Sequence, residues 1–242
     1  MTPRFYCAMP LAKDTTIQLP EGPARHAVSV LRLRSGSAIT LFNGEGGEFS
    51  ATIEDVARRN IRARIESHHD VERESPLHVT LVQGLASVER MDHVVQKAVE
   101  LGVTAIAPVE TSRSVMRISG PRAERRREHW RQIAIAACEQ CGRNRVPEIR
   151  LPGAFGDWLA EASPAARRLL LAPDATQSLS ALEAPRGAIE LLAGPEGGLS
   201  AGEAAAARRA GFRAVRLGPR VLRTETAGVA ALAAINALWG DW

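Results

Sequence analysis

The pattern of apolar and polar positions changes character about a third of the way along the chain. Within the first 75 residues, apolar and polar positions alternate over 37–42, 48–53 and 60–65. This period of two is typical of strands with one buried face. The first two stretches flank Asn43-Gly-Glu-Gly-Gly47, which favours a hairpin because such turns need positive φ. With a short helix over 23–31, this part is predicted to be a small β-rich unit.

The segment 68–76 is polar, highly charged and ends in proline, so it predicts a linker. His68, His69 and Asp70 are adjacent there and could supply metal ligands. Neighbouring histidines on a polar segment are more often simply solvated, and we expect no metal at this place.

From Leu77 onward the chain alternates between predicted strands and predicted helices. Strands are expected over 78–85, 104–109, 169–172, 188–193 and 214–217, and helices over 89–101, 122–139, 203–210 and 224–239. This alternation predicts an α/β fold with a mostly parallel sheet that helices cover on both faces. The last helix is apolar nearly all round, so it must be buried on all sides, and we expect a homodimer.

Composition places the chain among ordinary globular proteins. It has 242 residues, of which 45% are apolar and 24% charged. No apolar run approaches the roughly 18 residues of a membrane span, and the first residues lack a signal-peptide core, so we expect a cytoplasmic protein. Cys138 and Cys141 have CxxC spacing, but no second pair exists. They are expected to be small buried residues rather than metal or redox groups.

The positive charge is concentrated in one region. The formal net charge is +4, yet the first 75 residues carry ten basic and ten acidic side chains. Residues 111–150 carry ten basic and four acidic ones, a field that attracts phosphate backbones. Arginine outnumbers lysine 29 to 2, however, so a general arginine bias and a solvated helix face are an alternative. The arginines of the predicted helix are Arg122, Arg125, Arg126, Arg127 and Arg131.

Two glycine-bearing turns are the strongest candidates for chemistry. Residues 191–200 run from an apolar strand through Gly194-Pro-Glu-Gly-Gly198 into a helix, and Ser200 with Glu203 forms a predicted capping box. Glu203 is therefore expected to be a cap rather than a catalytic group. Glycines let a backbone approach a ligand closely, and ligands bind at the carboxyl ends of parallel strands. Glu196 is a solvated turn carboxylate, a loop organiser or the partner of a cationic ligand.

The second turn, 218–223, follows the strand at 214–217, and Thr224 is the expected N-cap of the next helix. The sequence has no GxGxxG after a strand, P-loop, HExxH or GxSxG motif. We therefore expect two loops side by side at one sheet edge, outside the common nucleotide-binding and hydrolase motifs.

Several separated motifs together resemble one family. They are 89–92 with 96–103, 139–143 with Val146 and Pro147, 194–198, 217–227, and the N-terminal residues 3–6, His26, 30–33 and 43–44. In this order they resemble the RsmE family, the 16S ribosomal RNA uridine N3-methyltransferases of the SPOUT class. Val88 departs from the pattern, because many relatives have lysine there.

The resemblance implies two domains and a cofactor. A PUA-like RNA-binding domain would span 1–72, and a SPOUT methyltransferase domain with a C-terminal trefoil knot would span 73–242. The protein would be a homodimer that binds S-adenosyl-L-methionine mainly through backbone groups, with no metal and no membrane partner. The cofactor-binding residues carried over are Leu192, Gly194, Glu196, Gly197, Leu217, Gly218, Leu222 and Arg223, joined by Arg220.

The implied reaction methylates N3 of a uridine in the 16S ribosomal RNA of the small subunit. Arg220 and Arg223 would favour the uridine anion, with Glu139 or Glu225 as proton acceptor. A helix-surface or capping role stays open for either glutamate. The RNA-binding candidates are Arg4, His26, Arg32, Arg90 and Arg143, and a structural salt bridge is an alternative role for Arg32. Alternatives are a SPOUT enzyme acting on another RNA, such as tRNA, and an RNA-binding protein that assists ribosome assembly without catalysis.

Overall fold

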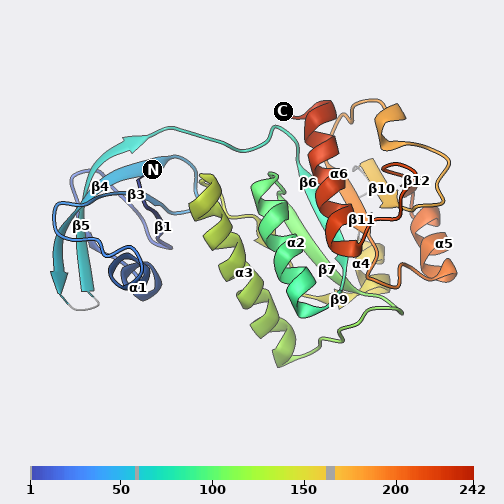
Figure 1. Cartoon of the computed structure of the whole chain (residues 1–242), viewed down its shortest axis with the longest axis horizontal. Coiled ribbons are helices and arrows are strands. Elements are labelled where there is room, and N and C mark those ends of the chain that lie inside the picture. Colours follow the sequence, from blue (N-terminus) through green and yellow to red (C-terminus); the bar gives the residue numbers. More distant parts are fainter. Residues whose placement is uncertain (1, 58–59, 162–166) are drawn as a thin grey trace. The chain divides into compact units, whose positions relative to one another are not determined.

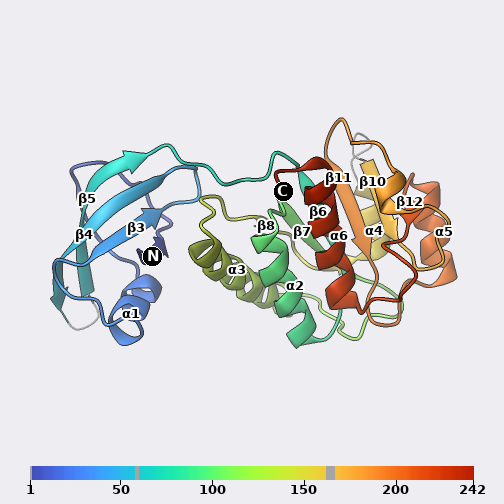
Figure 2. The same ribbon diagram turned by 45° about the horizontal axis from the view of Figure 1, so that its top comes forward.

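The computed structural model describes residues 2–57, 60–161 and 167–242. The chain forms two compact units (Figures 1 and 2). One contains the residues up to Glu74 together with Cys138–Val146, and the other contains Ser75–Ala137 and Pro147–Trp242. A segment from the second half of the sequence therefore completes the N-terminal unit.

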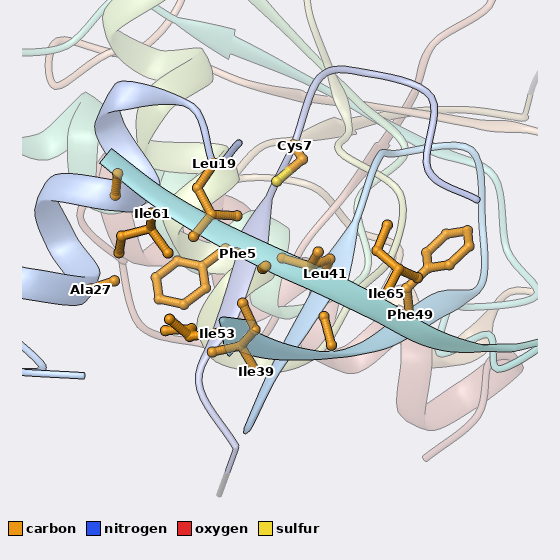
Figure 3. Close-up of a cluster of buried hydrophobic side chains, with 13 residues drawn as sticks. Phe5, Cys7, Leu19, Ala27, Ile39, Leu41, Phe49, Ile53, Ile61 and Ile65 are labelled. Carbon is orange, nitrogen blue, oxygen red and sulfur yellow. The ribbon is translucent and has the colours of Figure 1, made fainter. Parts of the chain in front are cut away.

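The first unit is built on a five-stranded sheet with the order β1-β3-β4-β5-β2. Strand β1 runs parallel to β3, and the other pairs are antiparallel. Inward-facing apolar side chains of these strands and of the helix fill the core, with Phe5, Leu41 and Ile61 among its fully buried members (Figure 3). The elements are β1 Arg4–Tyr6, β2 Thr16–Gln18, α1 Glu21–Ser29, β3 Ala38–Phe42, β4 Glu48–Ala57 and β5 Asn60–His69.

The predicted hairpin is confirmed and the predicted start of the linker is wrong. Strands β3 and β4 pair antiparallel, and Gly44, Gly46 and Gly47 between them all have positive φ. Strand β5 continues to His69, where the long β4 offers it partners, so His68 lies opposite Phe49. The two histidines are thus strand residues, and His69 Nε2 lies 2.8 Å from Ser50 Oγ.

The second unit contains a parallel sheet with the order β12-β10-β11-β6-β7-β8, and β9 also pairs with β7. Its strands are β6 Val79–Gly84, β7 Ala105–Glu110, β8 Glu148–Ile149, β9 Gly153–Ala154, β10 Arg167–Leu171, β11 Ile189–Ala193 and β12 Arg213–Val215. Its helices are α2 Val88–Glu100, most of α3 Pro121–Cys141, α4 Phe155–Glu161, α5 Ala201–Arg209 and α6 Thr224–Trp239, with a short 3₁₀ helix η1 Leu179–Ala181.

Helices cover both faces of this sheet, as the alternation predicted. Helices α2 and α6 lie side by side on one face (Figures 1 and 2), where Leu81 of β6 approaches Gly228 of α6. The next residue, Val82, points to the opposite face and packs with Phe155 of α4 and Ala207 of α5. The predicted fold class is confirmed, whereas the C-terminal knot stays a prediction.

Helix α6 differs from its prediction in two respects. Its buried residues, among them Leu232 and Ile235, form one face, whereas Ala230 and Ala233 are only half-buried within the chain. The N-cap is Arg223 rather than Thr224, and it makes no side-chain cap hydrogen bond. The Thr224 hydroxyl is instead engaged elsewhere, as described below. Among the described residues, no helix combines the length and apolar character that crossing a membrane requires.

Candidate functional site

A cavity of about 750 Å³ lies in the second unit, at the carboxyl ends of β10, β11 and β12. Parallel strands present the loops that follow them at the same sheet edge, so segments far apart in sequence meet there. The lining consists of residues 170–174, 193–201, 215–218 and 220–225, with Arg90, Arg113, Ala204, Arg208 and Ala227. Both predicted turns therefore contribute to one cavity.

Close packing leaves little room for a side chain on Gly194, where the first turn begins, or on the neighbouring Gly84. A Cβ on Gly84, at the end of β6, would lie 2.5 Å from Pro195 Cδ, and one on Gly194 would lie 3.1 Å from the Leu199 nitrogen. Gly198 has φ +67°, a conformation that L side chains rarely adopt. The loop can therefore present backbone groups to the cavity at close range.

Glu196 holds this turn to the neighbouring helix. Its Oε1 accepts the Ser87 N–H at 2.9 Å and Arg90 Nη1 at 2.7 Å, while Arg90 Nε lies 3.3 Å from Glu225 Oε2. Burial acts to raise the pKa of Glu196, but the Ser87 N–H and the Arg90 guanidinium outweigh it and hold that pKa below its usual range. Glu196 is therefore ionised at neutral pH and organises the loop.

Glu196 Oε2 is buried, and no other residue in the described part of the chain donates a hydrogen bond to it. A buried carboxylate oxygen without a donor is costly unless a ligand supplies one. Because Glu196 lines the cavity, this oxygen suits a ligand that carries positive charge or hydrogen-bond donors.

Arg113 belongs to the cavity although the sequence reasoning missed it. It follows the carboxyl end of β7 by three residues, and its Nη1 donates to the Gly197 carbonyl at 3.0 Å. The neighbouring Ser112 donates its N–H to Glu203 Oε1 at 2.7 Å. The signal that could have found Arg113 is its place after a parallel strand, at the edge where the two turns were expected.

The predicted capping box is confirmed. Ser200 accepts the Glu203 N–H, and Glu203 Oε2 accepts the Ser200 N–H at 2.8 Å. Burial acts to raise the pKa of Glu203, but the N–H groups of Ser112 and Ser200 outweigh it, so that pKa lies below its usual range. Glu203 thus anchors both the start of α5 and the segment after β7.

Most of the predicted cofactor residues line this cavity. Leu192 does not, because it is fully buried in the core that β11 shares with α4 and α5. Three of the predicted catalytic residues also line the cavity: exposed Arg220, exposed Arg223 and half-buried Glu225. Arg90, a predicted RNA-binding residue, lines it as well. The lining residues from the cofactor prediction are Gly194, Glu196, Gly197, Leu217, Gly218, Leu222 and Arg223.

Glu139 lies in the first unit and is not among the cavity residues. Its Oε1 accepts the Tyr6 N–H at 2.9 Å. Burial raises the pKa of this carboxyl above its usual range, and the Tyr6 N–H offsets only part of that effect. The contact fixes the last turn of α3 to β1, which the sequence could not indicate because the two are 133 residues apart.

The predicted RNA-binding residues of the first unit fall into two groups. Arg4 pairs with Glu48 and Arg143 with Glu74, and these arginine side chains are only 8% and 5% exposed. Both hold segment 138–146 within the unit, which favours a structural role. Exposed His26 lies edge-on to Phe5, and exposed Arg32 has φ +52°. Contact of these residues with RNA stays a prediction.

The cysteines are buried or half-buried, and the potential metal ligands among the described residues do not gather into a group. Cys138 is buried, Cys141 is half-buried, and burial raises the pKa of the Cys138 thiol to about 12. Such a thiol is a poor nucleophile and a poor metal ligand at neutral pH. Over the described ranges, no three His, Cys, Asp or Glu side chains gather as a metal site.

Comparison with known proteins agrees with this geometry. The RNA methyltransferase domain family matches residues 73–236, and the RNA methyltransferase PUA domain family matches 19–66. Ribosomal RNA small subunit methyltransferase E of Buchnera aphidicola (from Acyrthosiphon pisum) is 30% identical over 99% of this chain and 95% of that protein. Its counterpart from Mycobacterium tuberculosis is 34% identical over 90% of this chain and 84% of that protein.

Two solved structures match the whole chain. Ribosomal RNA small subunit methyltransferase E from Neisseria gonorrhoeae, bound to S-adenosyl methionine, is 40% identical with a TM-score of 0.94. A putative methyltransferase from Legionella pneumophila, in complex with the same cofactor, is 38% identical with a TM-score of 0.96. Each comparison covers 100% of both chains.

A parallel sheet with a cavity at its carboxyl edge, preceded by a β-rich unit, and the matching domain families define an RNA methyltransferase. The relatives narrow this class further. The chain belongs to the ribosomal RNA small subunit methyltransferase E family, as the resemblance of its motifs indicated.

Proposed function

We propose that this protein transfers the methyl group of S-adenosylmethionine to N3 of a uridine in 16S ribosomal RNA. The observation that carries the proposal is the cavity, because eight of the nine residues expected to bind the cofactor line it together. Its full-length likeness to an S-adenosylmethionine-bound member of the family supports the same reaction.

The cavity residues fit this cofactor. The segments 193–198 and 217–223 would hold it mainly through backbone groups, which the exclusion of side chains around Gly84 and Gly194 permits. The buried Oε2 of Glu196 suits a cationic ligand. When bound, S-adenosylmethionine supplies an electrophilic methyl group on a sulfonium.

The residues at the cavity rim would prepare the uridine. Its N3 is a weakly acidic imide that reacts as the anion, and the exposed guanidinium groups of Arg220 and Arg223 would stabilise that charge. Of the two glutamates first considered, Glu225 lines the cavity and Glu139 does not, so we assign proton acceptance to Glu225. Alignment of N3 with the methyl group would supply much of the rate.

The first unit and α3 would hold the surrounding RNA. Because N3 lies on the pairing edge of the base, the target uridine must be unpaired or splayed out. Exposed His26 and Arg32 remain our candidates in the first unit, in place of Arg4 and Arg143, whose side chains are paired with carboxylates and nearly inaccessible to solvent. On α3, Arg122 and Arg125 are exposed, which suits contact with phosphates.

We also propose that the protein acts as a homodimer in the cytoplasm, on the 16S RNA of the small subunit. The half-buried apolar stripe of α6 at Ala230 and Ala233, with Leu238 43% exposed nearby, supports a second copy as its cover.

The decisive experiment is nucleoside mass spectrometry of 16S ribosomal RNA from cells with and without this protein. We expect 3-methyluridine to disappear from the RNA when the protein is absent and to return when purified protein and S-adenosylmethionine are added. An unchanged level defeats the assignment. Calorimetry with S-adenosylmethionine then separates an enzyme for another RNA, which gives heat, from an RNA-binding protein without catalysis, which gives none.

A further inference from the structure

A buried polar network lies beneath the cavity, at the junction of three segments. Gln83 is the penultimate residue of β6, Gly194 opens the first cavity turn, and Thr224 begins α6. Gln83 is fully buried and Thr224 is 7% exposed. Neither side chain lies in a pattern that predicts such a network, since Thr224 stands where a helix cap was expected.

Each hydrogen bond of this network has an identifiable donor and acceptor. The Thr224 hydroxyl donates to the Gly194 carbonyl at 2.6 Å and accepts from Gln83 Nε2 at 2.9 Å. Gln83 Nε2 also donates to the Gly84 carbonyl at 3.1 Å. One amide and one hydroxyl thereby tie the ends of two parallel strands to the start of α6.

One atom of the network lowers the stability of the fold. Gln83 Oε1 is buried and accepts no hydrogen bond from the described part of the chain, and an unsatisfied buried oxygen destabilises a fold. It sits close to α6, since a Cβ on Gly228 would lie 3.4 Å from it and 3.3 Å from Leu81 Cδ1. An apolar side chain at position 83 would remove this unsatisfied oxygen, but it would also remove the donor that Nε2 supplies to the Gly84 carbonyl and to Thr224, so the value of the amide lies in the contacts of Nε2.

We propose that Gln83 and Thr224 are positioning residues for the cofactor, a role that rests on the proposed function. Gly194 and Thr224 both line the cavity, whereas Gln83 does not and acts through them. By fixing the Gly194 carbonyl, the network sets where the turn to Gly198 begins. By fixing Thr224, it sets the start of α6 and therefore the place of the adjoining Arg223. Both backbone loops that hold the cofactor are aligned by the same pair of side chains.

The test measures S-adenosylmethionine affinity by calorimetry and thermal stability without ligand, in the full chain. Thr224→Val removes the hydroxyl and keeps the shape, and we expect about tenfold weaker binding, as one net hydrogen bond predicts. Thr224→Ser restores the hydroxyl and should recover most of the affinity. Gln83→Met removes the donor Nε2 together with the unsatisfied oxygen, so it should weaken binding, while the two changes offset each other in stability and the melting temperature changes little.

Ser75→Ala is the matched control. Its hydroxyl donates to Asn236 Oδ1 at 3.0 Å, near the other end of α6, so its loss should lower stability without changing affinity. The inference is overturned if Thr224→Val binds like the wild type, if Thr224→Ser is as weak as Thr224→Val, or if affinity in all variants simply follows melting temperature. Wild-type protein that binds no S-adenosylmethionine would instead defeat the cofactor assignment itself.

Discussion

At the scale of single residues, the carboxylate of Glu196 links the shape of the cavity to pH. Its side chain is 20% exposed and its pKa lies below the usual range, because the Ser87 N–H and the Arg90 guanidinium outweigh the effect of burial. A depressed pKa means that the folded state holds the charged form more strongly than the unfolded chain does. The stabilisation is present above the unfolded pKa and is lost as pH falls through the folded pKa.

We therefore expect Glu196→Gln to lower the free energy of unfolding at neutral pH by about 1 kcal/mol, the scale of a charge-assisted hydrogen bond. The difference from the wild type should shrink as pH falls below about 4.3, the ordinary pKa of glutamate. Urea denaturation across a pH series measures it. Glu183→Gln, at an exposed position of the same unit, is the control. A difference that stays constant with pH contradicts the ionic role.

Arg223 is the residue on which the proposed chemistry depends most. Its side chain is exposed and makes no cap bond, so Arg223→Ala should leave the melting temperature unchanged. Loss of a group that stabilises the developing anion should lower turnover about 100-fold to 1000-fold. Single-turnover methylation of RNA measures the effect, with Arg213→Ala, at the amino end of β12, as control. Wild-type turnover in Arg223→Ala would remove Arg223 from the mechanism.

The sequence predicted which residues line the cavity better than it predicted the roles of residues in the first unit. The reason is physical. Gly194 and Gly218 follow parallel strands, and the edge at which such loops meet is fixed by topology. The roles of Arg4, Arg143 and Glu139 depend instead on contacts with segments tens of residues away or farther, which no local pattern encodes. The sequence of a motif is the same whether its arginine contacts a phosphate or a buried carboxylate.

At the scale of elements, the start of α5 joins the helix to the segment after β7. Ser200 supplies one half of the capping box, so Ser200→Ala should cost about 1 kcal/mol of unfolding free energy. Glu203 supplies the other half and also accepts from Ser112, so Glu203→Ala should cost about twice as much. Chemical denaturation compares them, with the exposed Ser180→Ala as reference. Equal losses would show that the Ser112 contacts contribute nothing.

The elements that periodicity predicted are those long enough to carry a pattern. The helices at 89–101 and 224–239 were placed within a residue or two, because each covers several turns. Most of the two- and three-residue strands, such as β1, β2 and β8, were missed, whereas the three-residue β12 overlaps the strand expected over 214–217. They exist because a distant strand offers hydrogen bonds, as β3 does to β1, and that information is not local.

At the scale of the whole molecule, the units are not consecutive in sequence. Segment 138–146 is held in the N-terminal unit by the Arg143–Glu74 pair, whose side chains are 5% and 22% exposed. Removing one partner of such a pair leaves a largely desolvated charge, so Arg143→Met should cost about 3 kcal/mol. Adding Glu74→Gln should recover part of that loss, which a double-mutant cycle measures.

The Arg145–Glu72 pair provides the matched control, because its side chains are 53% and 35% exposed. Solvent screens an exposed pair, so Arg145→Met should cost less than about 1 kcal/mol. If the two arginine variants lose the same stability, or if Glu74→Gln adds to the loss, segment 138–146 is held by its backbone and apolar contacts rather than by the buried pair.

Helix α6 also carries a partly open apolar stripe that bears on whether two copies of the chain associate. Ala230, Ala233 and Ala237 are spaced three and four apart on the face that the chain leaves partly open, beside Leu238. If a second copy covers this stripe, sedimentation should give a dimer at micromolar concentration. Ala233→Arg would then place a charge inside the interface and shift the mass to that of a monomer. Arg64→Glu, on the exposed side of β5, should leave the dimer intact. A monomeric wild type would mean that α6 is not a subunit interface.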